Sequence, residues 1–235
     1  MLNDAESLRT PKNICKHDIR NDPGRDLSEY GLESFSLENH HQEIDQFKLD
    51  ENVPEKIIVQ FETAKNIYLY AWYVYRFFTV AEHQALTCLE LSLREKLLDK
   101  VPKSYYPRSE KPMLRTLLRY AIDNSLIRNE GFSEWHEAAR KRAKYRYEIE
   151  QIKKMSDEGL ESIEVDYSNI AVMDEDKNFQ YVEDLKVGLI QHRNEYAHGS
   201  TMLHNYSLGT FRVVTEIINQ VYSENKLSGQ THVSS

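Results

Sequence analysis

The chain contains little cysteine, glycine or proline, and it has no long uninterrupted apolar run. Its two cysteines, Cys15 and Cys88, lie far apart in 235 residues, which is not the pattern of a disulfide-stapled scaffold and is typical of a reducing compartment. The most apolar stretch, residues 67 to 80, is interrupted by Arg76 and is dense in tyrosine, so it resembles neither a signal peptide nor a membrane span. We therefore expect a soluble, cytoplasmic protein that has no membrane partner.

The motifs of several common chemistries are also missing. There is no Walker A or G-x-G-x-x-G loop, so nucleotide hydrolysis of those types has no support. His136 and Glu137 begin like the zincin motif H-E-x-x-H, but Arg140 replaces the second histidine, and a cation there repels zinc. His40 and His41 are adjacent, so their side chains point apart on a helix or a strand. We expect no metal and no cofactor.

Glycine and proline are absent from residues 55 to 101, and this absence favours long helices. A single helix over that range would extend about 70 Å, which is too long for a compact domain, so we expect a break near Phe78 to Ala81. The alternation of Tyr68, Tyr70 and Trp72 on its own suits a strand. The helical spacing of the apolar residues before it favours a helix.

Further stripes of apolar residues at helical spacing predict helices at residues 114–122, 133–155, 179–197 and 206–222. The predicted fold class is therefore all-α, an antiparallel helical bundle of about six helices. We expect residues 1–52 to form an irregular acidic arm, partly ordered at most, and residues 53–235 to form the helical domain. Residues 156–178 have no helical period and suit an acidic loop or a short hairpin.

Charge is distributed unevenly along the chain. Residues 1–52 carry 6 basic and 12 acidic side chains, and residues 156–184 carry 1 basic and 10 acidic side chains. The net charge of the whole chain is −8, which leaves +7 for the remainder. Because the local field steers a polyanion more than the total charge does, the helical body can still attract phosphate.

One segment at the end of a predicted helix combines a cation, an amide and an imidazole: Arg193 to Gly199, R-N-E-Y-A-H-G. Arg193 presents a permanently charged fork of donors that suits the oxygens of a phosphate. His198 can exchange a proton near neutral pH, and Asn194 can orient the phosphate or His198. At about 100° per residue, Asn194 and His198 share a face, whereas Arg193 and His198 lie about 140° apart.

Each of these residues also has a structural interpretation. A histidine before a glycine cap can bond the last free carbonyls of a helix, Arg193 can form a salt bridge, and Asn194 can be a capping amide. A second pair with similar spacing, Arg76 and His83, has no adjacent asparagine and no helix stop behind it. We interpret that second pair as a chance match.

The segment R-N-E-Y-A-H-G resembles the R-x4-6-H signature of the HEPN superfamily. Residues 81–97 resemble the long second helix of that superfamily, and residues 66–78 resemble the aromatic helix that precedes it in some bacterial relatives. The resemblance covers roughly residues 54–224. It implies a HEPN-like helical bundle, which in many members of the superfamily is a metal-independent ribonuclease.

The resemblance also implies a mechanism and partners. Arg193, Asn194 and His198 would form the catalytic site of an endoribonuclease that cleaves RNA by attack of the ribose 2′-hydroxyl, without a cofactor. Members commonly pair as homodimers that bring two motifs to one cleft. The implied settings are toxin–antitoxin systems, abortive infection and other antiviral defence, with an antitoxin or another regulatory protein as a further partner. The alternative is a non-catalytic HEPN scaffold that binds RNA or a protein partner.

A second candidate for RNA contact is a basic stretch in the predicted helix at residues 133–155. Residues 140–154 carry seven basic and two acidic side chains, with tyrosine interleaved. Such a pattern can bind phosphates and stack bases. The same charges can instead form a solvated face or pair with the acidic segment at 156–184. The candidate RNA-binding residues are Arg140, Arg142, Lys144 and Arg146.

Overall fold

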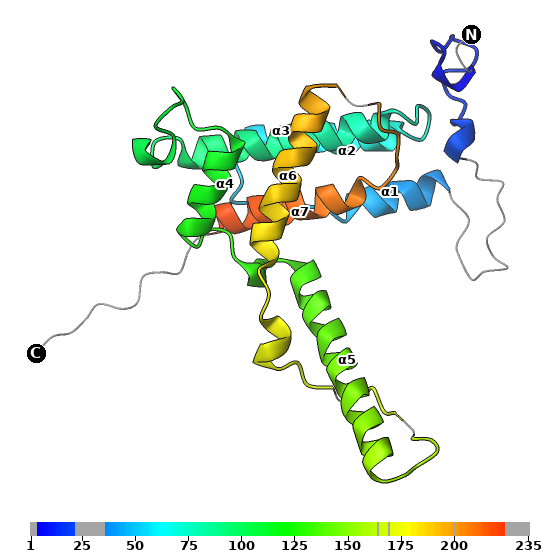
Figure 1. The fold of residues 1–235 in the computed structure, drawn as a ribbon. Coiled ribbons are helices and arrows are strands. Elements are labelled where there is room, and N and C mark those ends of the chain that lie inside the picture. Colours follow the sequence, from blue (N-terminus) through cyan, green and yellow to red (C-terminus); the bar gives the residue numbers. More distant parts are fainter. Residues whose placement is uncertain (1–3, 22–35, 164, 169, 200, 224–235) are drawn as a thin grey trace, which may run out of the picture.

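The computed structural model describes residues 4–21, 36–163, 165–168, 170–199 and 201–223, which fold into seven α-helices and no strand (Figure 1). The predicted all-α class is therefore confirmed. None of the helices in these residues combines the length and the hydropathy that crossing a membrane requires. The helices are α1 (Leu37–Asp45), α2 (Glu55–Tyr70), α3 (Phe77–Leu97), α4 (Leu114–Asp123), α5 (Ser133–Asp157), α6 (Tyr181–Ala197) and α7 (Leu208–Tyr222).

Helices α2 and α3 form an antiparallel pair, with α7 packed against α3 (Figure 1). Their apolar faces share one core with residues from α1, α4 and α6. Phe61, Tyr68 and Phe78 meet Phe211 or one another with ring centroids 5.3 to 5.8 Å apart, an edge-to-face arrangement that the aromatic quadrupole favours. The core is thus formed by the helix faces whose apolar residues recur at helical spacing in the sequence.

The break between α2 and α3 spans residues 71–76, so the predicted break at Phe78 to Ala81 is wrong. Contacts from far along the chain fix its position. The side-chain amide of Asn21 donates to the carbonyls of Ala71 and Trp72, at 2.8 and 3.1 Å, and the carboxylate of Asp18 accepts from the Tyr75 N–H at 3.2 Å. These bonds satisfy backbone groups that the helix ends leave free.

Helix α1 lies within the predicted N-terminal arm and is the helix that the sequence did not predict. Ser36 caps it by accepting from the Asn39 N–H at 3.1 Å. His40 is buried, stacks on Tyr68 at 4.4 Å and donates from Nε2 to the Tyr68 carbonyl at 2.9 Å. Residues 37–45 are thus an ordered part of the arm that packs on the helical body.

Helices α5 and α6 do not lie alongside α2, α3 and α7. Helix α6 crosses over α3 and packs on α3 and α4, whereas α5 extends away from the other helices (Figure 1). The described part of residues 156–178 contains no strand, and its short 3-10 helix, Asp174–Lys177, lies against α5. The end of α6 is therefore carried over the face of α3, where it reaches solvent.

Candidate functional site

The segment R-N-E-Y-A-H-G lies at the C-terminal end of α6. His198 is the capping residue, and its N–H donates to the Asn194 carbonyl at 3.0 Å. Gly199 follows with φ of +86°, a conformation that L side chains rarely adopt, and its N–H donates to the Tyr196 carbonyl at 3.3 Å. The glycine stop predicted from sequence therefore ends the helix immediately after His198.

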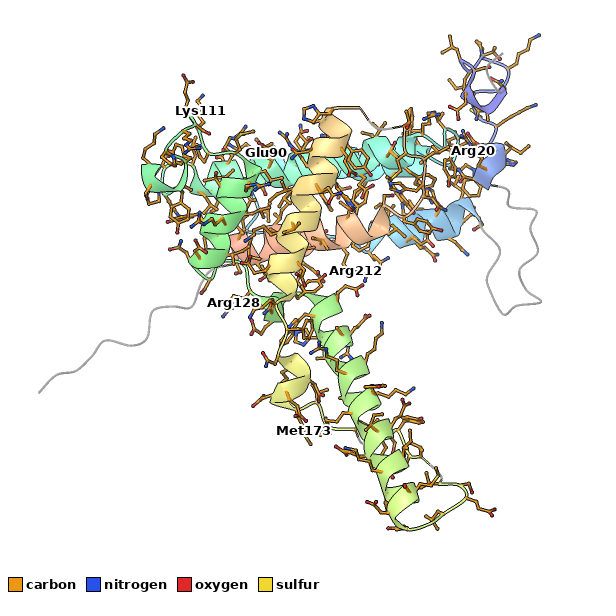
Figure 2. The ribbon with its side chains drawn as sticks, viewed as in Figure 1. Arg20, Glu90, Lys111, Arg128, Met173 and Arg212 are labelled. Carbon is orange, nitrogen blue, oxygen red and sulfur yellow. The ribbon has the colours of Figure 1, made fainter. Side chains whose placement is uncertain are left out.

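Arg193 is held by a carboxylate from another helix. Its Nε and Nη2 atoms donate to Oε2 of Glu90 on α3, at 3.2 and 3.0 Å. Glu90 lies where α6 crosses α3 (Figure 2), and its Oε1 accepts from Arg94 at 2.7 Å. The Arg193 side chain is 29% exposed and that of Glu90 is 11% exposed, so the pair sits at the edge of the core. Glu90 therefore fixes the direction of the guanidinium and partly neutralises it.

His198 is exposed, and its ring has no hydrogen-bond or ion-pair partner among the described residues. It lines an open depression of about 530 Å³ together with Asn194 and Glu195. Arg193 lines a separate pocket of about 250 Å³ between α4 and α6, and Asn194 lines that pocket as well. Asn194 is thus the residue shared by the two hollows.

Arg193 and His198 do not contact each other within one copy of the chain. This agrees with the angular separation expected for an ideal helix, in which Asn194 and His198 share a face and Arg193 points elsewhere. Arg193 Nη1 lies 3.5 Å from Asn194 Oδ1, so Arg193 contacts Asn194. Asn194 in turn lines the depression of His198, and we refer to Arg193, Asn194 and His198, with Asn194 in the middle, as the row at the end of α6.

A polar cluster around the buried Glu82 supports this end of α6, and it was not predicted from the sequence. Tyr196 donates to Oε2 of Glu82 on α3 at 2.5 Å, and His204 Nε2 lies 3.0 Å from the Tyr196 hydroxyl. Thr210 at the start of α7 donates to the other oxygen of Glu82, which is 2% exposed. Burial raises the pKa of Tyr196, and the hydrogen bond to Glu82 raises it further.

The sequence did contain a signal for this cluster. Glu82 stands at a helical position whose neighbours one turn away, Phe78, Ala85 and Leu86, are all buried. A charged residue at such a position requires hydrogen-bond partners, because an unpaired buried charge is costly. The partner Tyr196 lies within the helix predicted at residues 179–197, and a tyrosine hydroxyl commonly reaches a polar group at the edge of a core.

Part of the basic stretch on α5 contacts the acidic segment that follows it. Arg146 binds Asp176 at 3.0 Å and Glu175 at 3.2 Å. Arg142 lies over the Phe179 ring at 4.6 Å, and Lys144 lies over a tyrosine ring. These contacts hold Tyr167 and residues 171–179 against the helix (Figure 2, near Met173).

For Arg146 the structure thus matches one alternative left open by the sequence, in which the acidic segment pairs with this basic helix. Arg140 is exposed and has no polar partner among the described residues. Of the four candidates it is therefore the cation best able to meet an external anion. The RNA-binding role of the four residues stays a prediction.

The remaining motif residues are Arg76, His83 and His136, and of these three His83 lies near the end of α6. Arg76 pairs with Glu6, while His83, which the sequence analysis set aside with it, lies 6.0 Å from the Tyr196 ring. His136 Nε2 donates to the Glu130 carbonyl at 2.9 Å. Within the described ranges, no group of three or more His, Cys, Asp or Glu side chains could hold a metal ion.

Comparisons with known proteins found no match to this chain among family models, curated proteins or solved structures.

Proposed function

We propose that this protein is a metal-independent endoribonuclease of the HEPN type. One observation supports the proposal above all others: Arg193, Asn194 and His198 form a row at one helix end, and Asn194 lines both the pocket of Arg193 and the depression of His198. A phosphodiester that lies across Asn194 would meet a permanent cation on one side and an imidazole on the other.

These groups suit cleavage by the ribose itself. The 2′-oxygen attacks the adjacent phosphorus, its proton passes to a neutral imidazole, and the bond from phosphorus to the 5′-oxygen breaks. A protonated group donates to the departing 5′-oxygen, so the products carry a 2′,3′-cyclic phosphate and a 5′-hydroxyl. Arg193 would stabilise the charge that builds on the non-bridging oxygens. DNA would be spared because it lacks the 2′-hydroxyl.

A homodimer would complete this site. The reaction needs both a proton acceptor and a proton donor, and one copy contributes a single exposed histidine to the row. Two copies related by a two-fold axis would bring a second Arg193 and a second His198 to one phosphate. The setting we propose is a toxin or antiviral defence system, in which an antitoxin or another regulatory protein holds the nuclease silent.

A second candidate function is a non-catalytic HEPN scaffold that binds RNA or a protein partner. The contact between Arg193 and Glu90 favours it, because the carboxylate already occupies two donors of the guanidinium. In this alternative the row at the end of α6 is a structural helix end. Arg193 then contributes to the packing of α6 on α3 and not to chemistry.

The test is incubation of the purified protein with RNA in excess EDTA. Wild type would be compared with Arg193→Ala and His198→Ala, and the product ends would be identified by mass spectrometry. We expect each substitution to lower the cleavage rate by about a hundredfold or more. Binding without cleavage supports the scaffold, and cleavage that survives both substitutions contradicts the proposed site.

A further inference from the structure

A groove runs along the junction of α4 and α6 and leads away from the end of α6. The pocket that Arg193 lines continues into a second hollow of about 530 Å³. The two share Arg115, Ile190 and Asn194. The second hollow also shares Gln191 and Asn194 with the depression of His198. The three hollows therefore form one continuous surface with Asn194 at its centre.

The lining of this groove has charge of one sign. Two of its cations come from α4 (Arg115 and Arg119) and two from α6 (Lys186 and Arg193), and none of the described residues that line the two hollows is acidic. In a chain with a net charge of −8, such a lining marks a local positive field. Arg193, Gln191 and Asn194 add donors for hydrogen bonds to phosphate oxygens.

Arg115 differs from the other three cations because it has no polar partner. Arg193 is held by Glu90, Lys186 by Glu183, and Arg119 lies 3.5 Å from Asp123. No ion pair or hydrogen bond joins the exposed Arg115 side chain to any described residue. Its guanidinium is therefore free to bind an anion in the groove.

Arg115 and Arg119 stand one turn apart on α4, about 6 Å along the helix axis. Apolar residues line the same hollows: Met113 and Val187 expose 56% and 62% of their surfaces, and Ile190 lines both hollows. A line of cations beside apolar surface suits a nucleic-acid strand, because its phosphates can meet the cations while its ribose or base faces meet the apolar surface.

We propose that this groove binds the sugar–phosphate backbone of single-stranded RNA, with Arg115 as its main phosphate contact. The inference rests on the proposed function, since the groove delivers a strand to the row Arg193, Asn194 and His198. It adds a binding site outside the motif. In this proposal the principal RNA-binding surface is the groove between α4 and α6, and not the basic stretch on α5.

The test measures binding apart from cleavage. Fluorescence anisotropy with a 2′-O-methyl oligouridine 20-mer, which cannot be cleaved by a 2′-hydroxyl, gives Kd for the full chain over a range of salt concentrations. We expect Arg115→Glu to weaken binding at least about tenfold, and Arg115→Ala to lower the slope of log K against log salt by about 0.7. Arg115→Lys, which keeps the charge, restores most of the affinity.

Two controls separate this groove from other surfaces. Lys12→Glu makes the same acidic replacement of an exposed cation in the N-terminal segment, and we expect it to change Kd less than about twofold. Arg140→Glu tests the α5 stretch and should also have the smaller effect. Thermal unfolding checks that Arg115→Glu folds like wild type, as expected for an exposed side chain without polar contacts.

The outcomes distinguish the groove from the nuclease proposal. Binding that depends on Arg115, with no cleavage of any RNA, supports the groove and contradicts the nuclease. Cleavage by wild type, with Arg115→Glu binding and cleaving equally well, overturns the groove alone. Failure of wild type to bind the 20-mer also overturns the groove, and a larger effect of Arg140→Glu would move the RNA surface to α5.

Discussion

Arg193 on α6 and Glu90 on α3 join two helices that are distant in sequence, through two hydrogen bonds to a single carboxylate oxygen. The second oxygen of Glu90 binds Arg94, so one carboxylate orients two guanidinium groups. In the proposed nuclease this arrangement sets the direction of Arg193 toward the pocket between α4 and α6. Glu90 is then a positioning residue, which does not itself touch RNA.

Glu90→Gln tests this role, because it keeps the shape of the side chain and removes its charge. We expect kcat for RNA cleavage to fall about tenfold or more while KM stays constant or falls, since an Arg193 without a charged partner attracts phosphate more strongly but is less well directed. The matched control is Glu95→Gln on the same helix, whose partner Lys56 is 58% exposed. A wild-type kcat in Glu90→Gln would show that the orientation of Arg193 is irrelevant.

Two glycines, Gly188 within α6 and Gly199 just after its cap, predict opposite effects of one substitution. Gly199→Ala forces a side chain onto a residue with φ of +86°, so we expect about 1 kcal/mol less stability and a lower cleavage rate, because the turn that holds His198 is displaced. Gly188→Ala adds a methyl group within the helix where nothing lies within 4 Å, and should stabilise by about 0.5 to 1 kcal/mol. Urea unfolding of both variants measures the difference, and equal shifts would contradict the assigned conformations.

Tyr196→Phe tests the buried cluster beneath the site. The substitution removes the hydroxyl that donates to Glu82 and leaves that carboxylate with one donor fewer, so we expect a loss of about 1 to 3 kcal/mol in the free energy of unfolding. Tyr145→Phe, on a side chain that is 67% exposed, should change it by less than about 0.5 kcal/mol. Equal stability of Tyr196→Phe and wild type in urea would mean that the cluster contributes nothing.

His40 predicts a pH dependence of stability. Burial lowers the pKa of His40, and the hydrogen bond to the Tyr68 carbonyl offsets this only in part. The unfolded chain therefore binds this proton more tightly than the folded chain does. The stabilising contribution is complete above the ordinary histidine pKa of about 6.5 and is lost as the pH falls toward the lower folded value.

Urea unfolding at several pH values between 5 and 8 measures this effect. We expect the stability of wild type to fall more steeply below pH 6.5 than that of His40→Phe, whose aromatic ring keeps the stacking position but cannot take up a proton. His41→Gln controls for the loss of an exposed histidine from the same helix. Identical slopes for wild type and His40→Phe would contradict the prediction.

Local chemistry explains which features could be predicted from sequence. The end of α6 followed from Gly199, because a left-handed cap is a property of one residue and its immediate neighbours. The helical faces followed from apolar spacing. The break between α2 and α3 did not, because it depends on Asp18 and Asn21, which lie some fifty residues away in the chain. Helix α1 was missed because its nine residues expose mostly polar side chains.

The site was predictable only as a list of residues. The spacing of Arg193, Asn194 and His198 marked the segment, but Glu90 is separated from Arg193 by 103 positions, and only the crossing of α6 over α3 brings the two together. Arg115 and Arg119 carried a weaker signal, namely two arginines one turn apart on the polar side of an apolar stripe. Their proximity to Asn194 depends on how α4 packs against α6.

The most direct test of the central claim is cleavage of a random-sequence RNA 30-mer pool in excess EDTA, beside the same pool made of DNA. The account predicts that wild type cuts RNA alone, that the products carry 2′,3′-cyclic phosphate and 5′-hydroxyl ends, and that His198→Ala abolishes the cut. An absence of RNA cleavage by wild type, cleavage of the DNA pool, or an unchanged rate in His198→Ala would contradict it.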